Sequence, residues 1–449
     1  MSKPKEYSSM TKDKLMIYTF VALVILTVVT AVLWTAEKTP SGWNLGLTLG
    51  INAIIAVGLA VGFDVLLYKT TADSPLNIMS AAVFGLIVTD SYSLGMPSMA
   101  IDKVLPLQAP ECFLYVALIT IIGLVVFKKL VGTLGRKYVN PAAAAKLLVL
   151  IPFLNVILLA KDHLVTSFNG QGLPPLTSGI GYTGSGSFAF WIQSCLGNSK
   201  AQTAPAAADV FYTYFIQKFH GWVGGASSLG VIIVGVALFI LCRKYVKWRV
   251  TAAYLGTVTL MSLLMTLVYG GDPLLRLGFE LFIGSSIFLA FFMATDPATT
   301  PLTFTGQAIF GLGVGVLTVI IQTYMNFLGG SILALVIMNL TTPLLDNVGL
   351  RKPILEKKVP HLPKAKQFES VSTVECIRCG ECLLVCCHDL SPIVIKEAFD
   401  KNNVQRLTKL KADLCDGCGH CSYVCPARID LKGSILRAKA SLRKTQEPQ

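Results

Sequence analysis

Ten stretches of roughly 20 apolar residues constrain the fold of this chain more than any other feature of its sequence. They lie near residues 15–35, 45–67, 76–95, 111–127, 142–160, 224–242, 251–270, 277–294, 305–325 and 330–346. A chain that is 53% hydrophobic and 14% charged cannot bury this much apolar surface in one soluble globule. In a bilayer the backbone polar groups need internal partners, so spans of this length form helices. The sequence therefore predicts an all-α polytopic membrane domain of ten transmembrane helices over residues 15–349.

Basic residues mark one end of the predicted helices. They gather in four groups, within residues 3–14, 128–137, 243–249 and 351–358. With ten spans all four groups fall on one side of the membrane, which the positive-inside rule identifies as cytoplasmic. The net charge of +13 then reflects topology and predicts no nucleic-acid partner. We expect a cytoplasmic leader (1–14) ahead of an anchor that is not cleaved, an outer loop (161–223), and both termini in the cytoplasm.

A weak internal sequence similarity suggests two related halves in the membrane domain. Thr89-Asp90 closes the third span, and Thr295-Asp296 closes the eighth. Each pair ends the third span of a five-span half, and an odd number of spans per half would make a 5+5 inverted repeat. The alternative is that these are two unrelated helix ends, each stopped by an aspartate and a nearby proline.

Two cysteine runs near the C-terminus carry eight of the chain's 12 cysteines. They read Cys376-x2-Cys379-x2-Cys382-x3-Cys386 and Cys415-x2-Cys418-x2-Cys421-x3-Cys425. Two-residue gaps let a tight turn point three sulfurs at one iron–sulfur cluster, and the longer gap sends the fourth sulfur to the other cluster. Two alternatives fit the pattern less well. Zinc ribbons pair two C-x2-C units rather than two runs of four cysteines, and disulfides are rare in a reducing cytosol.

The spacing therefore predicts two [4Fe–4S] clusters with crosswise ligands. The expected sets are Cys376, Cys379, Cys382 and Cys425 for one cluster, and Cys415, Cys418, Cys421 and Cys386 for the other. This spacing is typical of bacterial ferredoxins. We expect a small cytoplasmic α+β domain of that kind at residues 369–449, joined to the membrane domain by a linker at 350–368.

One position departs from the cysteine pattern. Cys387 follows Cys386 where the pattern has a proline, as Pro426 stands after Cys425. Cys387 is either a buried spare thiol or an alternative ligand. The cysteines at 112, 195 and 242 lie in or beside apolar segments and are interpreted as packing residues.

Ionisable residues within the predicted spans are a second functional lead. They are Asp64, Asp90, Lys146, Glu280 and Asp296. A charge in hydrocarbon is costly and often marks an ion pathway or a pair. The alternative for each is a position near a span end, from which the side chain reaches the interface.

Several motifs in the membrane domain resemble a known family. They are Phe292-Met-Ala-Thr-Asp-Pro-Ala-Thr-Thr-Pro301, Thr305-Gly-Gln-Ala-Ile-Phe-Gly-Leu-Gly-Val-Gly315, Met338-Asn-Leu-Thr-Thr-Pro-Leu-Leu-Asp346, Val139-Asn-Pro-Ala142 and Trp248-Arg249. Residues 15–350 resemble the D subunit of the Rnf electron-transport complex and, equally, the B subunit of the sodium-pumping NADH:quinone reductase.

The cysteine-rich end resembles a different protein of the same complex. Its motifs Cys376-Ile-Arg-Cys379-Gly380 and Cys421-Ser-Tyr-Val-Cys425-Pro-Ala427 are similar to the iron–sulfur tail of the Rnf C subunit. Neither of these complexes is associated with a chain that joins such a membrane domain to such a cysteine-rich end.

The resemblance implies an FMN joined through a phosphoester to a threonine of the outer loop, in a pattern like Asp-Gly-x-Ser-Gly-Ala-Thr. The aligned position is Thr203, whose context, Asn198-Ser-Lys-Ala-Gln-Thr203, lacks the Ser-Gly-Ala core. Rival positions are Thr183 or Ser185 in a glycine-rich stretch, and Ser227. A chain without covalent flavin is the remaining alternative.

We therefore expect a membrane electron-transfer subunit of an Rnf-like, redox-driven, ion-translocating oxidoreductase complex. Its partners would be other membrane and cytoplasmic subunits and a soluble ferredoxin-like or nicotinamide-linked electron donor or acceptor. Two alternatives remain: a non-pumping iron–sulfur conduit to a quinone-like carrier, and a transporter with a redox-sensing iron–sulfur tail.

Overall fold

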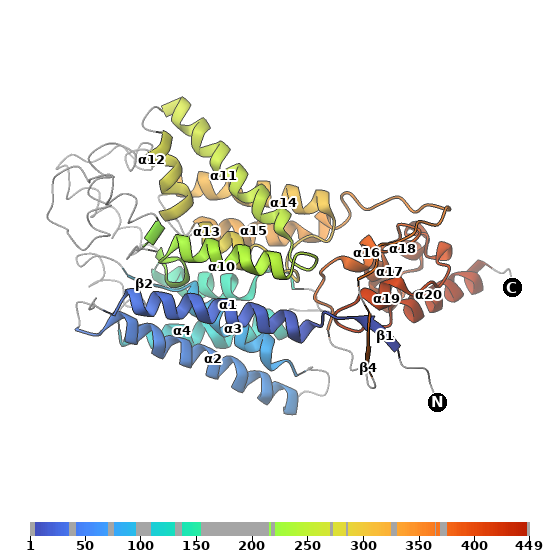
Figure 1. Cartoon of the computed structure of the whole chain (residues 1–449), viewed down its shortest axis with the longest axis horizontal. Helices are drawn as coiled ribbons and strands as arrows, with labels where there is room; N and C mark the ends of the chain where they lie inside the picture. The colour runs from blue at the N-terminus through green and yellow to red at the C-terminus, as the bar shows by residue number, and fades with distance from the viewer. Residues whose placement is uncertain are drawn as a thin grey trace.

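The chain folds into a bundle of apolar helices with a smaller cysteine-rich part at one end (Figure 1). This computed structural model describes residues 5–35, 42–70, 76–95, 109–130, 137–153, 215–216, 221–269, 273–283, 286–324, 330–363, 365–368 and 375–446. Within these ranges the chain is mostly helical, with two short two-stranded sheets. Both termini lie at the end of the bundle that carries the cysteine-rich part.

Nine apolar helices make up most of the bundle in the part of the chain that the structure describes. Five regions are long enough to cross a bilayer: α1 (Lys12–Leu33), α2 (Leu45–Thr70), α4 with η3 (Glu111–Ile122 and Gly123–Leu130), α11 (Trp248–Tyr269) and α14 (Phe304–Tyr324). The shorter ones are α3 (Ile78–Asp90), α5 (Pro141–Leu150), α10 (Ser228–Leu241) and α15 (Gly330–Leu345). Each overlaps a predicted span, which confirms a polytopic helical membrane protein.

The predicted eighth span alternates between α- and π-helical segments in its described residues. It is divided into α12 (Pro273–Gly278), the π-helical η7 (Phe279–Ile283), α13 (Ser286–Phe288) and the π-helical η8 (Leu289–Met293). Hydroxyl groups bond to backbone carbonyls in this region. Ser286 Oγ donates to Glu280 O at 2.8 Å, and Thr251 Oγ1 donates to Ala290 O at 2.6 Å. Such contacts help an irregular helix persist at membrane depth.

Small residues let the helices of the bundle approach closely. A Cβ atom on Gly85 of α3 would lie 2.8 Å from Ala56 O of α2, and one on Gly311 of α14 would lie 2.6 Å from Val250 O of α11. Glycine at such contacts favours van der Waals packing between membrane helices. The two halves of the bundle meet where α1 packs on α10 and α5 packs on α15.

The cysteine-rich part has a hydrophobic core of its own. It contains α16 (Glu381–Leu384), α17 (Pro392–Asp400), α18 (Val404–Lys409), α19 (His420–Val424) and α20 (Leu431–Gln446). Its core includes Ile393, Ile395, Leu407, Leu431, Ile435, Ala438 and Leu442. The predicted α+β character is not confirmed, because residues 375–446 are described without a gap and contain no strand.

The predicted leader is an ordered strand. β1 (Lys5–Ser8) pairs antiparallel with β4 (Ala365–Phe368), so the start of the chain bonds to the segment that follows the last helix of the bundle. Lys12 N also donates to Pro426 O at 3.0 Å, beside the last cysteine of the second run. A second small sheet, β2 (Ser93–Gly95) with β3 (Gly221–Trp222), lies at the opposite end of the bundle.

Candidate metal centres

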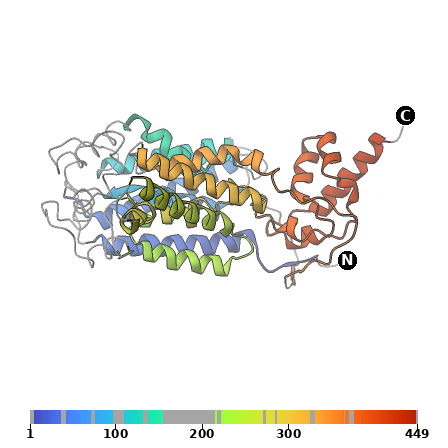
Figure 2. The same cartoon turned by 90° about the horizontal axis from the view of Figure 1, so that it is seen from above.

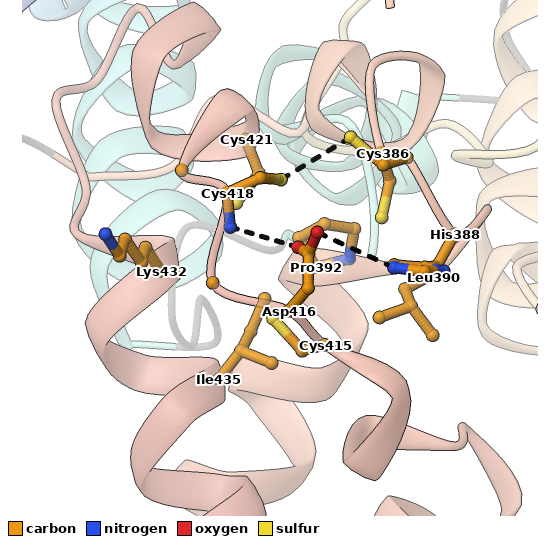
Figure 3. Close-up of a pocket in the computed structure, with 13 residues that line it drawn as sticks. Cys386, His388, Leu390, Pro392, Cys415, Asp416, Cys418, Cys421, Lys432 and Ile435 are labelled. Carbon is orange, nitrogen blue, oxygen red and sulfur yellow. Dashed lines mark hydrogen bonds and ion pairs between the residues drawn. The ribbon is translucent and has the colours of Figure 1, made fainter. Parts of the chain in front are cut away.

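The eight cysteines of the two runs surround two separate cavities. One cavity is lined by Cys376, Cys379, Cys382 and Cys425. The other is lined by Cys386, Cys387, Cys415, Cys418 and Cys421 (Figure 3). Each cavity thus takes three cysteines from one run and a fourth from the other run. We call them the first and the second cavity.

The two runs adopt the same backbone turn around their first cysteines. Arg378 and Gly417, which precede the second cysteine of each run, have φ of 53° and 74°. Gly380 and Gly419, which follow it, have φ of 84° and 83° and begin α16 and α19. Glycine adopts this left-handed conformation without a steric penalty, whereas Arg378 does not. Repetition of the turn explains why three sulfurs of each run face one cavity.

The same repetition extends to the fourth cysteine of each run. Asp389 and Arg428 both lie three residues after it, have φ of 52° and 58°, and donate their backbone N–H to Cys386 O and Cys425 O at 3.2 and 3.1 Å. The backbone therefore aligns Cys386 with Cys425, and Cys387 takes the place of the proline. Cys387 is nonetheless a member of the second cavity.

Cys387 is in contact with two groups of the second run. Its Sγ lies 3.5 Å from Cys418 Sγ and 3.1 Å from His420 Nδ1, and its side chain is fully buried. These three residues are close enough to share one metal ion. Burial, together with the neighbouring Cys418, raises the pKa of Cys387 to about 12. Its role as a spare thiol or an alternative ligand stays a prediction.

Burial disfavours bare thiolates at several cysteines that line the two cavities. Burial raises the pKa of Cys376 to about 11 and that of Cys421 to about 12. The pKa values of Cys379 and Cys382 rise well above that of an ordinary thiol, first through burial and then through the neighbouring sulfurs. Four sulfurs gathered around one cavity are stable together as thiolates only with a cationic centre between them. The donor sets therefore fit a thiolate-ligated iron–sulfur cluster.

The first cavity lies against the helical bundle. Ile377 belongs to the hydrophobic core of the bundle, and Cys379 packs on that core. A Cβ atom on Gly380 would lie 3.4 Å from Leu302 O, in the loop before α14. The leader closes another side, where Arg428 donates to Ser8 O at 3.0 Å.

A buried arginine between two cysteines ties this cavity to the bundle. Arg378 is 1% exposed, and its Nη2 lies 2.7 Å from Asp346 Oδ2 at the end of α15. Its Nη1 forms an ion pair with Glu397 of α17, and its backbone N–H donates to Cys376 Sγ at 3.3 Å. Asp346 also accepts a hydrogen bond from Leu302 N at 3.0 Å. The ion pair between Arg378 and Asp346 was not predicted from the sequence. The only feature that pointed to it was a charged residue, Arg378, inside a cysteine run.

Two of the ionisable residues predicted within spans have local structural partners. Asp64 is buried, and it pairs with Lys129 at 2.8 Å and accepts from Asn77 N at 2.9 Å. Asp296 accepts from Ala298 N at 3.2 Å and so closes the turn after η8. These contacts favour a structural role for both aspartates.

Asp90 is the last residue of α3, and Lys146 of α5 contacts the residue that follows it, Ser91. Asp90 is fully buried and accepts from Thr27 Oγ1 at 2.9 Å, while Lys146 donates to Ser91 O. The Lys146 ammonium also lies 4.8 Å from the centre of the Trp222 ring, a cation–π contact. Both charged groups are therefore held by the protein rather than by the membrane interface.

Glu280 and Ser227 complete the set of described candidates. Glu280, in η7, is 2% exposed and accepts from Thr323 Oγ1 at 3.4 Å. Ser227 caps α10, where its Oγ accepts from Gly230 N at 3.2 Å. The other candidate flavin positions, Thr203, Thr183 and Ser185, lie outside the described residues.

Comparison with known proteins covers the part of the chain ahead of the cysteine runs. The model of the NQR2, RnfD, RnfE family matches residues 1–354. The D subunit of the Na(+)-translocating ferredoxin:NAD(+) oxidoreductase complex of Acetobacterium woodii is 27% identical over 261 residues, which cover 58% of this chain and 72% of that protein. The D subunit of the ion-translocating oxidoreductase complex of Shewanella amazonensis is 28% identical over 315 residues, 68% of this chain and 85% of that protein. With a match across more than half of its length, the chain belongs to the NQR2, RnfD, RnfE family.

Proposed function

We propose that this chain is a membrane electron-transfer subunit of an Rnf-like, ion-translocating oxidoreductase complex, and that it carries its own pair of [4Fe–4S] clusters. One cluster would be held by Cys376, Cys379, Cys382 and Cys425, and the other by Cys415, Cys418, Cys421 and Cys386. The observation that carries the proposal is the crosswise sharing of cysteines between two cavities, fused to a bundle of this family. Relatives that are named as the D subunits of ion-translocating complexes support the placement in such a complex.

Bound clusters of this type supply one-electron transfer, and the chain tunes and positions them. The backbone N–H of Arg378 donates to Cys376 Sγ. A hydrogen bond of this kind stabilises the reduced, more negative form of a bound cluster, so it would raise the reduction potential of a cluster in the first cavity. Ile377 and Cys379 bury that cavity against the bundle and exclude water from it. The first cavity is thereby placed for exchange with the membrane domain.

The proposal is tested by purification of the full chain without oxygen, followed by analysis of iron and acid-labile sulfide. Two clusters require about eight of each per chain. Sodium or proton dependence of turnover in vesicles would separate a pumping complex from a plain conduit to a quinone-like carrier. Solute uptake that persists after cluster removal would instead identify a transporter with a redox-sensing tail.

Substitutions of the two adjacent cysteines should have unequal effects. We expect Cys386→Ala to lower the iron content by about four per chain, and Cys387→Ala to leave it unchanged, because the backbone aligns Cys386 with Cys425. Iron analysis and electron paramagnetic resonance of the reduced protein measure both variants. The reverse result would make Cys387 the ligand.

We also propose the full topology predicted from the sequence: a leader (1–14), ten spans over 15–349 as a 5+5 inverted repeat, a linker (350–368) and a cysteine domain (369–449). The contacts of α1 with α10 and of α5 with α15 support the repeat, since they pair the first and the fifth spans of the two halves. The positive-inside rule supports a cytoplasmic cysteine domain and cytoplasmic termini.

An outer-loop flavin is the last part of the proposal. We expect mass spectrometry of the natively produced chain to find an FMN-sized adduct on the peptide that contains Thr203, and to find none in a Thr203→Val variant. An adduct that persists in this variant would move the site to a rival such as Thr183 or Ser185. An intact mass equal to that of the bare chain would remove covalent flavin from the electron path.

A further inference from the structure

The second cavity is the one that lies nearest to solvent. Among the cysteines that the structure describes, Cys418 alone is exposed, whereas Cys382 and Cys425 of the first cavity are buried. Electron transfer slows steeply with distance, so a soluble redox protein would exchange electrons more readily at the second cavity. The surface around Cys418 is therefore the candidate docking site for such a protein.

The segment that carries Cys418 is rich in exposed basic side chains. Between residues 401 and 443, eight basic side chains are exposed or half-exposed: Lys401, Arg406, Lys409, Lys411, Lys432, Arg437, Lys439 and Arg443. Only three acidic residues occur in the same segment: Asp413, Asp416 and Asp430. Asp416 pairs with Lys357 at 2.6 Å, and Asp430 accepts from Gly433 N at 2.9 Å. We call the eight basic residues the basic face.

Helix α20 connects the basic face to the second cavity. Lys432 lines that cavity, and Lys439 Nζ donates to Cys415 O at 2.8 Å. A Cβ atom on Gly417 would lie 3.5 Å from Leu436 of the same helix. The apolar side of α20 is used in the core of the cysteine-rich part, and its basic residues lie on the two flanks of that side, Arg437 on one and Lys432, Lys439 and Arg443 on the other.

The position and extent of the basic face favour a soluble protein as its partner. Both views place α20 at the end of the molecule away from the helical bundle (Figures 1 and 2). Lys432 and Arg443 are about 16 Å apart along the helix axis, at the rise of an α-helix. A spread of this kind suits the surface of a protein better than a single phosphate group.

We propose that the basic face is the docking surface for a small soluble electron-carrier protein with an acidic surface. The inference rests on the proposed function, because it assumes that the second cavity holds a redox group. Opposite charges raise the rate of encounter and orient the carrier toward Cys418. Because these charges are exposed, salt weakens the attraction.

The test uses the full chain in nanodiscs of zwitterionic lipid, titrated by calorimetry with an oxidised, acidic two-cluster ferredoxin. We expect binding at low salt that weakens as salt is added. The triple variant Lys432→Gln/Arg437→Gln/Arg443→Gln should bind about tenfold more weakly. The control Lys69→Gln/Arg243→Gln/Lys352→Gln removes the same charge from exposed residues elsewhere, and its dissociation constant should stay within about twofold of the parent value.

Three results would overturn the proposal: no binding of the ferredoxin, equal affinity of the two triple variants, or equal binding of a basic cytochrome c. Binding of anionic lipid vesicles in place of the ferredoxin would also overturn it and identify a membrane contact. Iron content and reduction by dithionite are measured on the same samples. If these are normal while the ferredoxin fails to bind, the docking surface is wrong and the proposed function stands.

Discussion

In a Cys425→Ser variant, we expect the first three cysteines of the other run to become reactive. Cys425 belongs to the second run, but its sulfur lines the first cavity with Cys376, Cys379 and Cys382. Its loss should release about four irons per chain. Brief alkylation of the native variant, followed by peptide mass spectrometry, should then label those three cysteines and leave Cys415 protected.

The matched variant is Cys421→Ser, in the same run and four residues away. Cys421 lines the second cavity, so the labelled cysteines should now be Cys386, Cys415 and Cys418, while those of the first cavity stay protected. If both variants exposed the same cysteines, each run would be an independent site. The crosswise assignment would then be wrong.

Loss of the Arg378 guanidinium should loosen the cysteine-rich part from the bundle. An Arg378→Met substitution leaves Asp346 and Glu397 without their common partner, and Asp346 is 4% exposed. Removal of one member of a buried ion pair costs about 3–5 kcal/mol, because the remaining charge is uncompensated. We expect a lower thermal transition for loss of cluster absorbance and faster proteolysis between the bundle and the cysteine runs.

Two further variants separate docking from a general loss of stability. Arg243→Met makes the same change at an exposed arginine and should alter neither measurement. Asp346→Asn added to Arg378→Met removes the uncompensated carboxylate but keeps an acceptor for Leu302 N, so it should recover part of the loss. Unchanged proteolysis in Arg378→Met would show that other contacts hold the two parts together.

The sequence predicted the features that depend on spacing. Apolar stretches placed helices such as α1, α2 and α14, because a bilayer allows few alternatives to a helix. The gaps between the cysteines also predicted which sulfurs lie together, since three close cysteines must share a turn.

Features that depend on distant contacts were not predictable in the same way. The change from α- to π-helix within 277–294 does not appear in hydropathy, because the described residues remain apolar while their backbone hydrogen bonding changes. The pairing of Arg378 with Asp346 joins residues 32 positions apart through packing of two parts of the molecule. The leader was expected only to be cytoplasmic, and its pairing with β4 could not be predicted because the partner strand lies more than 350 residues away in the sequence.

The pairing of β1 with β4 restricts how many times the chain between the two strands can cross the membrane. Two strands that share backbone hydrogen bonds must lie in the same compartment, so the chain between Ser8 and Ala365 crosses the membrane an even number of times. Gain or loss of a single span would put the two strands on opposite sides and separate the leader from the cysteine runs. Proteins with this architecture can therefore change their number of spans only in pairs.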